Sequence, residues 1–262
     1  MSTCPADLVA FAGRLADAAG EAIRPYFRQP IPVETKADST PVTQADREGE
    51  RAMRDLIARH YPGHGVIGEE FGESDAGAGS VWVLDPIDGT TSFVTGRPWF
   101  GTLIALVHKG ETVLGIIDQP VSGERWVGAR GRPTTLNNRD ISVRPCAGLG
   151  QASLDCTDAA MFTEAEGAAF AIIRDQAARV RYGTDCYAYG LLAAGFVDLV
   201  IEATMEYYDF AALVPVIEGA GGTITDWDGA PLGRGSDGRV VAAGDSRVHE
   251  AALAHLGPAA QE

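Results

Sequence analysis

The stretch WVLDPIDGTTSF, residues 82–93, ends an apolar run with two aspartates and continues directly into a glycine and two threonines. The apolar run predicts a buried strand, and two unpaired carboxylates at the end of a buried strand carry a large desolvation cost. Asp85 and Asp88 must therefore either emerge into a cleft or face a positive charge. Gly89 permits an unusual backbone conformation, and the threonines that follow are suited to cap a helix, whose first N–H groups bind phosphate well.

A phosphate at this turn would be repelled by the two aspartates unless cations stood between them. Carboxylate oxygens are hard ligands of the kind that select Mg²⁺. The alternative interpretation is a capped strand–turn–helix without a ligand, because Asp-Gly turns are common. For this stretch alone, both interpretations remain open.

Two further acidic positions stand at the ends of apolar segments. Glu69 lies in GEE after an apolar run, and Asp209 precedes the apolar segment FAALVPVIEGAGG. Taken alone, Glu69 is typical of a solvated loop and Asp209 of a plain helix cap. Together with Asp85 and Asp88, however, they stand where an α/β sheet forms its ligand crevice. Three or four converging carboxylates suit a two-metal site for phosphoryl transfer.

The composition excludes several classes of partner. The chain has 262 residues and a net charge of -15, so repulsion opposes binding to nucleic acid or to acidic membranes. No run approaches the ~20 apolar residues of a membrane helix, and no signal peptide is evident. The four cysteines have neither C-x-x-C spacing nor a histidine at zinc-site spacing, which favours reduced thiols. We expect a cytoplasmic protein whose partner is a small molecule.

Periodicity and turn residues predict an alternation of helices and strands. Helices are expected over 8–27, from Thr43 onward, and over 164–178, 185–195 and 210–222, with a last one after Ser246. Strands are expected over 64–70, 101–110, 112–120, 124–131, 151–156, 197–203, 223–227 and 240–244, those between 101 and 131 being antiparallel. Residues 34–46 should form an extended loop or a short hairpin, and 72–80 a mobile glycine-rich loop.

These elements group into two halves of one compact unit. Residues 1–145 form an α+β half with an antiparallel sheet and the acidic motifs. Residues 146–262 form an α/β half that contributes Asp209. No long linker or internal repeat separates the halves, so we expect a cleft between them.

Three motifs resemble those of the inositol monophosphatase superfamily, a group of Mg²⁺-dependent, lithium-sensitive phosphatases. They are residues 82–93, GEE at 68–70, and YDFAALVPVIEGAGG at 208–222, and the similarity extends to TKADSTPVTQAD at 35–46. The resemblance implies a layered αβαβα sugar-phosphatase fold with two packed sheets. It also implies two or three Mg²⁺ ions and a homodimer.

The resemblance implies a role for each motif residue. The side chains of Glu69, Asp85, Asp88 and Asp209 and the carbonyl of Ile87 would bind the metal ions. Gly89 and Thr90 would offer backbone N–H groups to the phosphate. The Thr90 hydroxyl and Glu69 would also orient and activate the attacking water.

Two residues nearer the N-terminus are assigned by the same resemblance. Asp46 would hydrogen-bond Thr90 and increase its basicity, and Lys36 would lie near the loop over the metals. Asp46 also stands three residues after Thr43, so it could simply complete a helix cap. Lys36, on a polar loop, could simply be solvated.

The alcohol half of the substrate must be recognised by other residues. By resemblance, Gly183, Thr184, Asp185 and Glu202 would contact the leaving-group alcohol together with Asp88. Two acids facing the alcohol favour a cationic one. The alternative is that Asp185 caps its helix and Glu202 ends a strand.

Residues 100–128 and 182–203 resemble the histidinol-phosphatase branch of the superfamily more closely than the inositol branch. The predicted reaction is the Mg²⁺-dependent hydrolysis of L-histidinol phosphate to L-histidinol and phosphate, a step of histidine biosynthesis, by attack of a metal-activated water. An inositol-1-phosphate or broad sugar-phosphate phosphatase is the alternative. A non-catalytic phosphate-binding regulatory protein is the alternative of another class. A haloacid-dehalogenase-type enzyme is disfavoured because its D-x-D-x-T signature is absent from DPID.

Overall fold

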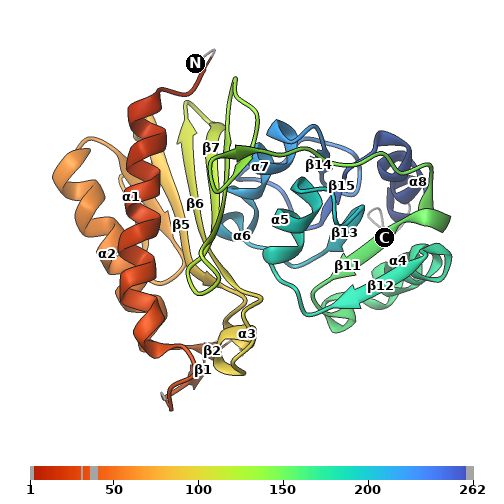
Figure 1. Ribbon diagram of the computed structural model, residues 1–262, viewed down its shortest axis with the longest axis horizontal. Helices are drawn as coiled ribbons and strands as arrows, with labels where there is room; N and C mark the ends of the chain where they lie inside the picture. Colours follow the sequence, from red (N-terminus) through yellow and green to blue (C-terminus); the bar gives the residue numbers. More distant parts are fainter. Residues whose placement is uncertain (1–2, 31, 36–40, 258–262) are drawn as a thin grey trace.

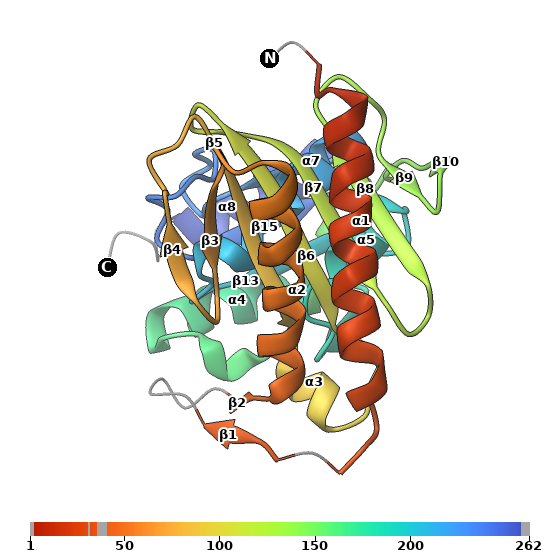
Figure 2. The same cartoon turned by 90° about the vertical axis from the view of Figure 1, so that its left-hand side faces the viewer.

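The computed structural model describes residues 3–30, 32–35 and 41–257. Five layers follow one another across the molecule, from two outer helices through a first sheet, a central helical layer and a second sheet to another pair of helices (Figure 1). The outer helices α1 (Ala6–Ile23) and α2 (Gln44–His60) lie side by side over the first sheet (Figure 2). The helix predicted over 8–27 ends earlier, because Pro25 lacks an N–H group, and the chain continues as the 3₁₀ turn η1 (Arg24–Tyr26).

The first sheet has eight strands in the order β10-β9-β8-β7-β6-β5-β3-β4. Its strands are β3 (Gly65–Gly68), β4 (Gly72–Ser74), β5 (Ser80–Asp88), β6 (Gly101–His108), β7 (Glu111–Gln119), β8 (Glu124–Ala129), β9 (Thr135–Leu136) and β10 (Arg139–Asp140). All neighbours pair antiparallel except β3 and β5, which run parallel. The predicted antiparallel strands between 101 and 131 are confirmed. The prediction of a loop over 72–80 is wrong at its start, because β4 pairs with β3 there.

The second sheet has five strands in the order β12-β11-β13-β15-β14, with β11 parallel to both its neighbours and the remaining pairs antiparallel. Its strands are β11 (Ser153–Cys156), β12 (Arg179–Tyr182), β13 (Leu199–Glu202), β14 (Thr223–Thr225) and β15 (Val240–Ala243). The other elements are β1 (Glu34–Thr35), β2 (Pro41–Val42), α3 (Thr90–Val94), η2 (Leu149–Gln151), η3 (Ala159–Met161), α4 (Glu164–Gln176), α5 (Tyr187–Ala193), α6 (Tyr207–Phe210), α7 (Leu213–Gly219) and α8 (Ser246–Leu256).

Helices α5, α6 and α7 lie between the two sheets, whereas α4 and α8 cover the outer face of the second sheet (Figure 1). The helix predicted over 210–222 is divided into α6 and α7. Pro215 cannot donate the hydrogen bond that would join the two turns, although Ala211 and Ala212 keep helical backbone angles.

Three apolar clusters fill the spaces between the layers. In β5, Trp82 and Leu84 belong to the cluster under α1 and α2, while Val81 and Val83 belong to the cluster between the sheets. A third cluster, which contains Phe170, joins the second sheet to α4 and α8. Alternate residues of a strand point to opposite faces, so the central strands must be apolar throughout. The predicted layered αβαβα fold with two packed sheets is confirmed.

Three further expectations concern the cysteines, the membrane spans and the boundary between the two halves. The four cysteines are buried and free, in agreement with the predicted thiols. Within the described part of the chain, no helix is both long and apolar enough to cross a membrane. The boundary between halves at residue 145 stays a prediction, and the central apolar cluster contains side chains from both sheets.

Candidate active site

A β-bulge at the end of β5 places its two aspartates on one side of the sheet. Residues three apart in a regular strand point to opposite faces. Here Asp85 pairs with Leu103 and Asp88 with Gly101, so three steps along β5 match two along β6. The extra residue lets both carboxylates face the same pocket, and bulges commonly turn side chains in this way beside active sites. The Ile87 N–H group donates to Asp85 Oδ1 over 3.0 Å and fixes that carboxylate.

Gly89 turns the chain from β5 into α3 and requires glycine for two reasons. Its φ of 88° lies in the left-handed region, which side chains disfavour. A Cβ atom at this position would also lie 2.8 Å from Cγ of Asp185. The turn therefore brings the first residues of α3 and the loop before α5 to the same pocket.

A third aspartate reaches the bulge from the central helical layer. Asp209 lies on α6, where its Oδ2 accepts a hydrogen bond of 2.8 Å from the N–H group of Glu206, the N-cap residue. The cap predicted for Asp209 is thus made by Glu206, with Asp209 completing it from the third helical position. One carboxylate oxygen each from Asp85, Asp88 and Asp209 lies within 4.8 Å of the others.

Burial of these carboxylates disfavours their charged forms. Burial, reinforced by the Glu69 charge, raises the pKa of Asp85 well above its ordinary value. Burial and the Asp185 charge do the same to the pKa of Asp88. Burial raises the pKa of Asp209 to about 8. The cluster therefore needs either protons or a cation to be stable.

The donor set fits a hard divalent cation. None of the described Arg or Lys residues forms an ion pair with Asp85, Asp88 or Asp209. All three offer carboxylate oxygens, and the carbonyl of Ile87 lies at the same strand end. Oxygen donors of this kind bind Mg²⁺ or Ca²⁺ rather than softer metals.

These pKa directions predict a pH-dependent stabilisation by Mg²⁺. A carboxyl whose pKa is raised in the folded state stabilises the fold below its unfolded pKa, near 4, and loses that contribution as the pH rises through its folded pKa. For Asp209 this window extends to about pH 8. The contribution of this carboxyl alone should therefore lower the melting temperature of the metal-free protein between about pH 5 and about pH 8. Mg²⁺ binds the ionised carboxylates, so it should raise the melting temperature more at pH 8 than at pH 5. Equal shifts at both pH values, measured by scanning calorimetry, would contradict this picture.

Glu69 follows β3 and begins a turn. The buried Glu50 of α2 fixes that turn. Glu50 Oε2 accepts a hydrogen bond of 2.7 Å from the Glu70 N–H group, and Glu50 Oε1 pairs with Arg54 Nε at 2.6 Å. A Cβ atom on Gly68 would lie 2.1 Å from Glu50 Oε1, so β3 can approach Glu50 this closely only because residue 68 is glycine. The sequence analysis missed Glu50, whose spacing from Arg54 resembles any surface i,i+4 pair.

Asp46 makes both of the contacts that the sequence left as alternatives. Its Oδ2 accepts hydrogen bonds from the Thr43 N–H group at 2.8 Å and the Thr43 hydroxyl at 2.6 Å, which completes the cap of α2. Its Oδ1 lies 3.4 Å from the Thr90 hydroxyl. That hydroxyl has a single proton and lies closer, 3.0 Å, to the Ile87 carbonyl oxygen. Lys36 lies outside the described residues.

Asp185 faces the pocket from the loop before α5. Its Oδ2 accepts a hydrogen bond of 2.7 Å from the Ser92 hydroxyl, and its backbone has a φ of 45°. It does not cap α5, whose N-cap is Cys186, so that alternative is wrong. The Cys186 N–H group instead donates to Asp88 Oδ2 over 2.7 Å. Burial raises the pKa of Asp185 to about 6.

The remaining predicted alcohol contacts are not brought to the pocket. Thr184 is buried, and its hydroxyl donates to Asp155 over 3.1 Å. Gly183 is likewise absent from the residues that line the pocket. Glu202 ends β13 and is buried. Its Oε1 accepts a hydrogen bond of 3.1 Å from the Thr157 N–H group, and its Oε2 one of 2.9 Å from the Tyr189 hydroxyl.

The acidic pocket has a volume of about 440 Å³. Its lining consists of Glu69, Asp85, Ile87, Asp88, Gly89, Thr90, Thr91, Asp185, Thr204, Glu206, Tyr208 and Asp209. The predicted site residues did not include four of these lining residues, Thr91, Thr204, Glu206 and Tyr208. Two of them, Glu206 and Tyr208, lie within three residues of Asp209, so the motif around Asp209 already pointed to this segment.

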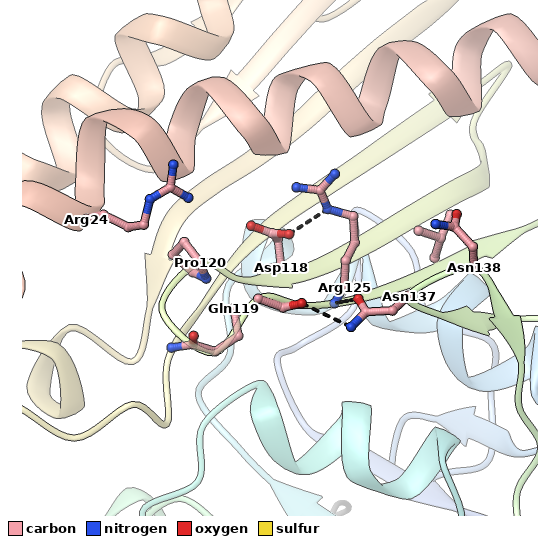
Figure 3. Close-up of a pocket in the computed structure, with 9 residues that line it drawn as sticks. Arg24, Asp118, Gln119, Pro120, Arg125, Asn137 and Asn138 are labelled. Atoms are coloured by element: carbon pink, nitrogen blue, oxygen red, sulfur yellow. Dashed lines mark hydrogen bonds and ion pairs between the residues drawn. The ribbon is translucent and has the colours of Figure 1, made fainter.

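A second pocket, of about 320 Å³, lies where the C-terminal end of α1 meets β7 and β8 (Figure 3). Its charged groups largely neutralise one another: Arg125 pairs with Asp118 at 2.6 Å and with Asp17 at 2.8 Å. Asn137 donates to the Gly123 carbonyl and holds the β7–β8 turn. These contacts are structural, and the candidate active site is the acidic pocket.

Known proteins are similar to this chain in sequence and in fold. A model of the inositol monophosphatase family matches residues 5–261. Bifunctional phosphatase IMPL2, chloroplastic, from Arabidopsis thaliana is 53% identical over 251 residues, which cover 92% of this chain and 72% of the relative. A histidinol-phosphatase from Mycobacterium tuberculosis is 37% identical over 255 residues, covering 92% of this chain and 95% of the relative. The structure of an inositol monophosphatase from Zymomonas mobilis matches with a TM-score of 0.89 and 48% identity, covering 96% of this chain and 98% of that one.

The layered fold and the carboxylate pocket define a class of metal-dependent phosphatases. The chain belongs to the inositol monophosphatase family, and the resemblance seen in its motifs is confirmed. It is a phosphatase of that family.

Proposed function

We propose that this phosphatase hydrolyses L-histidinol phosphate to L-histidinol and phosphate, with Mg²⁺ as its metal. The observation that supports this substrate is the charge of the pocket. Six carboxylates line it, those of Glu69, Asp85, Asp88, Asp185, Glu206 and Asp209. None of its described lining residues is an Arg, Lys or His.

The negative charge exceeds what the metals and the phosphate require. Even without Glu69, the other five carboxylates, when ionised, and a phosphate of about two negative charges together exceed the six positive charges of three Mg²⁺ ions. A neutral polyol such as inositol would leave this excess uncompensated in a partly desolvated pocket. L-Histidinol carries an ammonium group and an imidazole, so it compensates the excess by charge complementarity.

Each residue of the site has a proposed task. The side chains of Asp85, Asp88, Asp209 and Glu69 and the Ile87 carbonyl would hold Mg²⁺. Bound Mg²⁺ would neutralise the phosphate oxygens and lower the pKa of water. The N–H groups of Gly89 and Thr90 would hold the phosphate at the start of α3.

The attacking water would be held by Glu69 and the Thr90 hydroxyl. Thr90 can turn its proton from the Ile87 carbonyl to Asp46 Oδ1, which frees a hydroxyl lone pair to accept a hydrogen bond from that water. As the new P–O bond forms and the bond between phosphorus and the L-histidinol oxygen breaks, Glu69 would accept one proton of the water, and the leaving oxygen would take up a proton from solvent. Asp46, already fixed by its cap to Thr43, would serve as a positioning residue.

The known proteins include phosphatases named for either substrate. The Mycobacterium tuberculosis relative is named for histidinol phosphate, and the Zymomonas mobilis structure for inositol monophosphate. Hydrolysis of inositol-1-phosphate or other sugar phosphates is therefore the second candidate, and the acidic Asp185 argues against it. A homodimer and a cytoplasmic location stay predictions.

A phosphate-release panel tests the proposal. The purified protein is given L-histidinol phosphate, inositol-1-phosphate, fructose-1,6-bisphosphate or adenosine bisphosphate, each with Mg²⁺ and with excess EDTA. We expect the highest kcat/KM with L-histidinol phosphate and no activity in EDTA. Full activity in EDTA would refute the metal requirement, and a higher kcat/KM with inositol-1-phosphate would refute the substrate.

A further inference from the structure

We infer that Glu206, not Glu202, is the acid that works with Asp185 to recognise the cationic alcohol. The inference rests on the proposed function and adds a specificity-determining residue to it. The two acids reach the same pocket from different elements: Asp185 precedes α5, and Glu206 is the N-cap residue of α6. A substrate with two separate basic groups would therefore meet one carboxylate from each element.

Glu202 is excluded from this task by its partners. It is buried and does not line the pocket, and both of its oxygens accept hydrogen bonds, one from Thr157 and one from Tyr189. A buried carboxylate that is already satisfied would lose these bonds if it turned toward a substrate. Its position at the end of β13 instead ties that strand to α5.

Glu206 has the opposite surroundings. Its residue is exposed and lines the acidic pocket, next to Thr204 and Tyr208. The Glu206 side chain shares a capping box with the Asp209 backbone, and because the residue is exposed on the pocket wall its carboxylate remains accessible to a ligand. Tyr208 adds an aromatic ring to the same wall, and aromatic rings attract cations.

The backbone around Glu206 is held firmly in place. The Glu206 N–H group donates to Asp209 Oδ2, and the Met205 N–H group donates to the Gly238 carbonyl over 3.0 Å. A Cβ atom on Gly238 would lie 2.4 Å from the Met205 carbonyl oxygen, so the two segments touch through backbone alone. Such fixed backbone preorganises a recognition residue.

Two residues that line the pocket have unusual backbone angles. Thr204 has a φ of 59° and Asp185 a φ of 45°, values that residues with side chains rarely adopt. Among the described non-glycine residues with positive φ, these are the two that line the acidic pocket. Strained angles persist where the surrounding structure enforces them, and they concentrate at ligand sites. The unusual angles thus lie at Asp185 itself and two residues before Glu206.

The test compares Glu206→Gln with Glu250→Gln, a matched change at an exposed residue of α8 outside the pocket. The ratio of kcat/KM for L-histidinol phosphate to that for inositol-1-phosphate is measured for both variants with Mg²⁺. We expect Glu206→Gln to lower this ratio about fivefold through a higher KM for L-histidinol phosphate, as loss of a partly exposed ion pair implies. Glu250→Gln should leave the ratio unchanged.

Calorimetric binding of the product L-histidinol gives a second readout. We expect Glu206→Gln to weaken the binding of L-histidinol about fivefold. Glu202→Gln should instead change the melting temperature of the protein. An unchanged ratio and unchanged L-histidinol affinity in Glu206→Gln would overturn this inference alone. Failure of the wild-type protein to use L-histidinol phosphate would overturn the proposed function and this inference together.

Discussion

Replacement of Asp85 by Asn should lower kcat/KM by ~10³-fold or more while the fold stays intact, because the loss of one carboxylate charge removes several kcal/mol of metal and transition-state stabilisation. Asn keeps the oxygen that accepts the Ile87 N–H hydrogen bond, so the bulge at the end of β5 retains its geometry. The change also removes a buried carboxyl whose pKa is raised by burial and by Glu69, so its ionisation no longer opposes folding. In the absence of metal, the variant should therefore melt no lower than the wild type at neutral pH.

The measurements are phosphate-release kinetics and calorimetric melting with and without Mg²⁺. Asp228→Asn, an exposed change outside the pocket, is the control and should behave as the wild type. Near-normal turnover by Asp85→Asn would contradict the placement of the metal site. A loss of activity with a melting temperature that collapses in every buffer would instead assign Asp85 a structural role.

Replacement of Asp185 by Asn should change the choice of substrate more than the chemistry. Asn tolerates the left-handed φ of 45° and can still accept the Ser92 hydrogen bond, whereas Ala would add backbone strain. A charge-assisted hydrogen bond to the cationic alcohol is worth about 1.5–3 kcal/mol, which corresponds to roughly 10-fold to 100-fold. We expect kcat/KM for L-histidinol phosphate to fall by that factor relative to inositol-1-phosphate.

The contribution of Asp185 should exceed that of Glu206, because Asp185 is more buried. An unchanged ratio of the two substrates in Asp185→Asn would remove the specificity argument. An equal loss with both substrates would indicate that Asp185 acts on Gly89 and the phosphate turn, which it closely approaches.

The sequence predicted the features that depend on neighbouring residues. The end of β5, its glycine turn and the following helix lie within a dozen residues, so composition and order suffice to place Asp85, Asp88 and Gly89. The short turn segments between the apolar runs likewise predicted the antiparallel strands β6, β7 and β8. The resemblance to a family supplied the layered arrangement, which no local pattern determines.

The assignments that the sequence could not make concern side chains whose partners are distant in sequence. Glu202 was expected at the alcohol, but Thr157 and Tyr189, which satisfy it, come from β11's end and from α5. Glu50 is invisible in the sequence for the same reason, since the turn that it holds lies twenty residues away. Asp46 could not be assigned to a cap or to Thr90 because its two oxygens do both.

The missed strands have local explanations. Strand β12 is the edge of the second sheet, and its arginines are exposed, so it shows no apolar alternation. The hairpin of β9 and β10 was readable from Asn137 and Asn138, whose positive φ values suit a tight turn. Strand β4 begins at Gly72, and the glycine-rich composition after it concealed a three-residue strand.

A competition assay tests the central claim most directly. L-Histidinol phosphate and inositol-1-phosphate are mixed in equal amounts with Mg²⁺, and both are followed in one tube by phosphorus NMR, so their relative rates give the ratio of kcat/KM. The account predicts that L-histidinol phosphate disappears first and that EDTA stops its loss. Inositol-1-phosphate disappearing first, or at an equal rate, would contradict it.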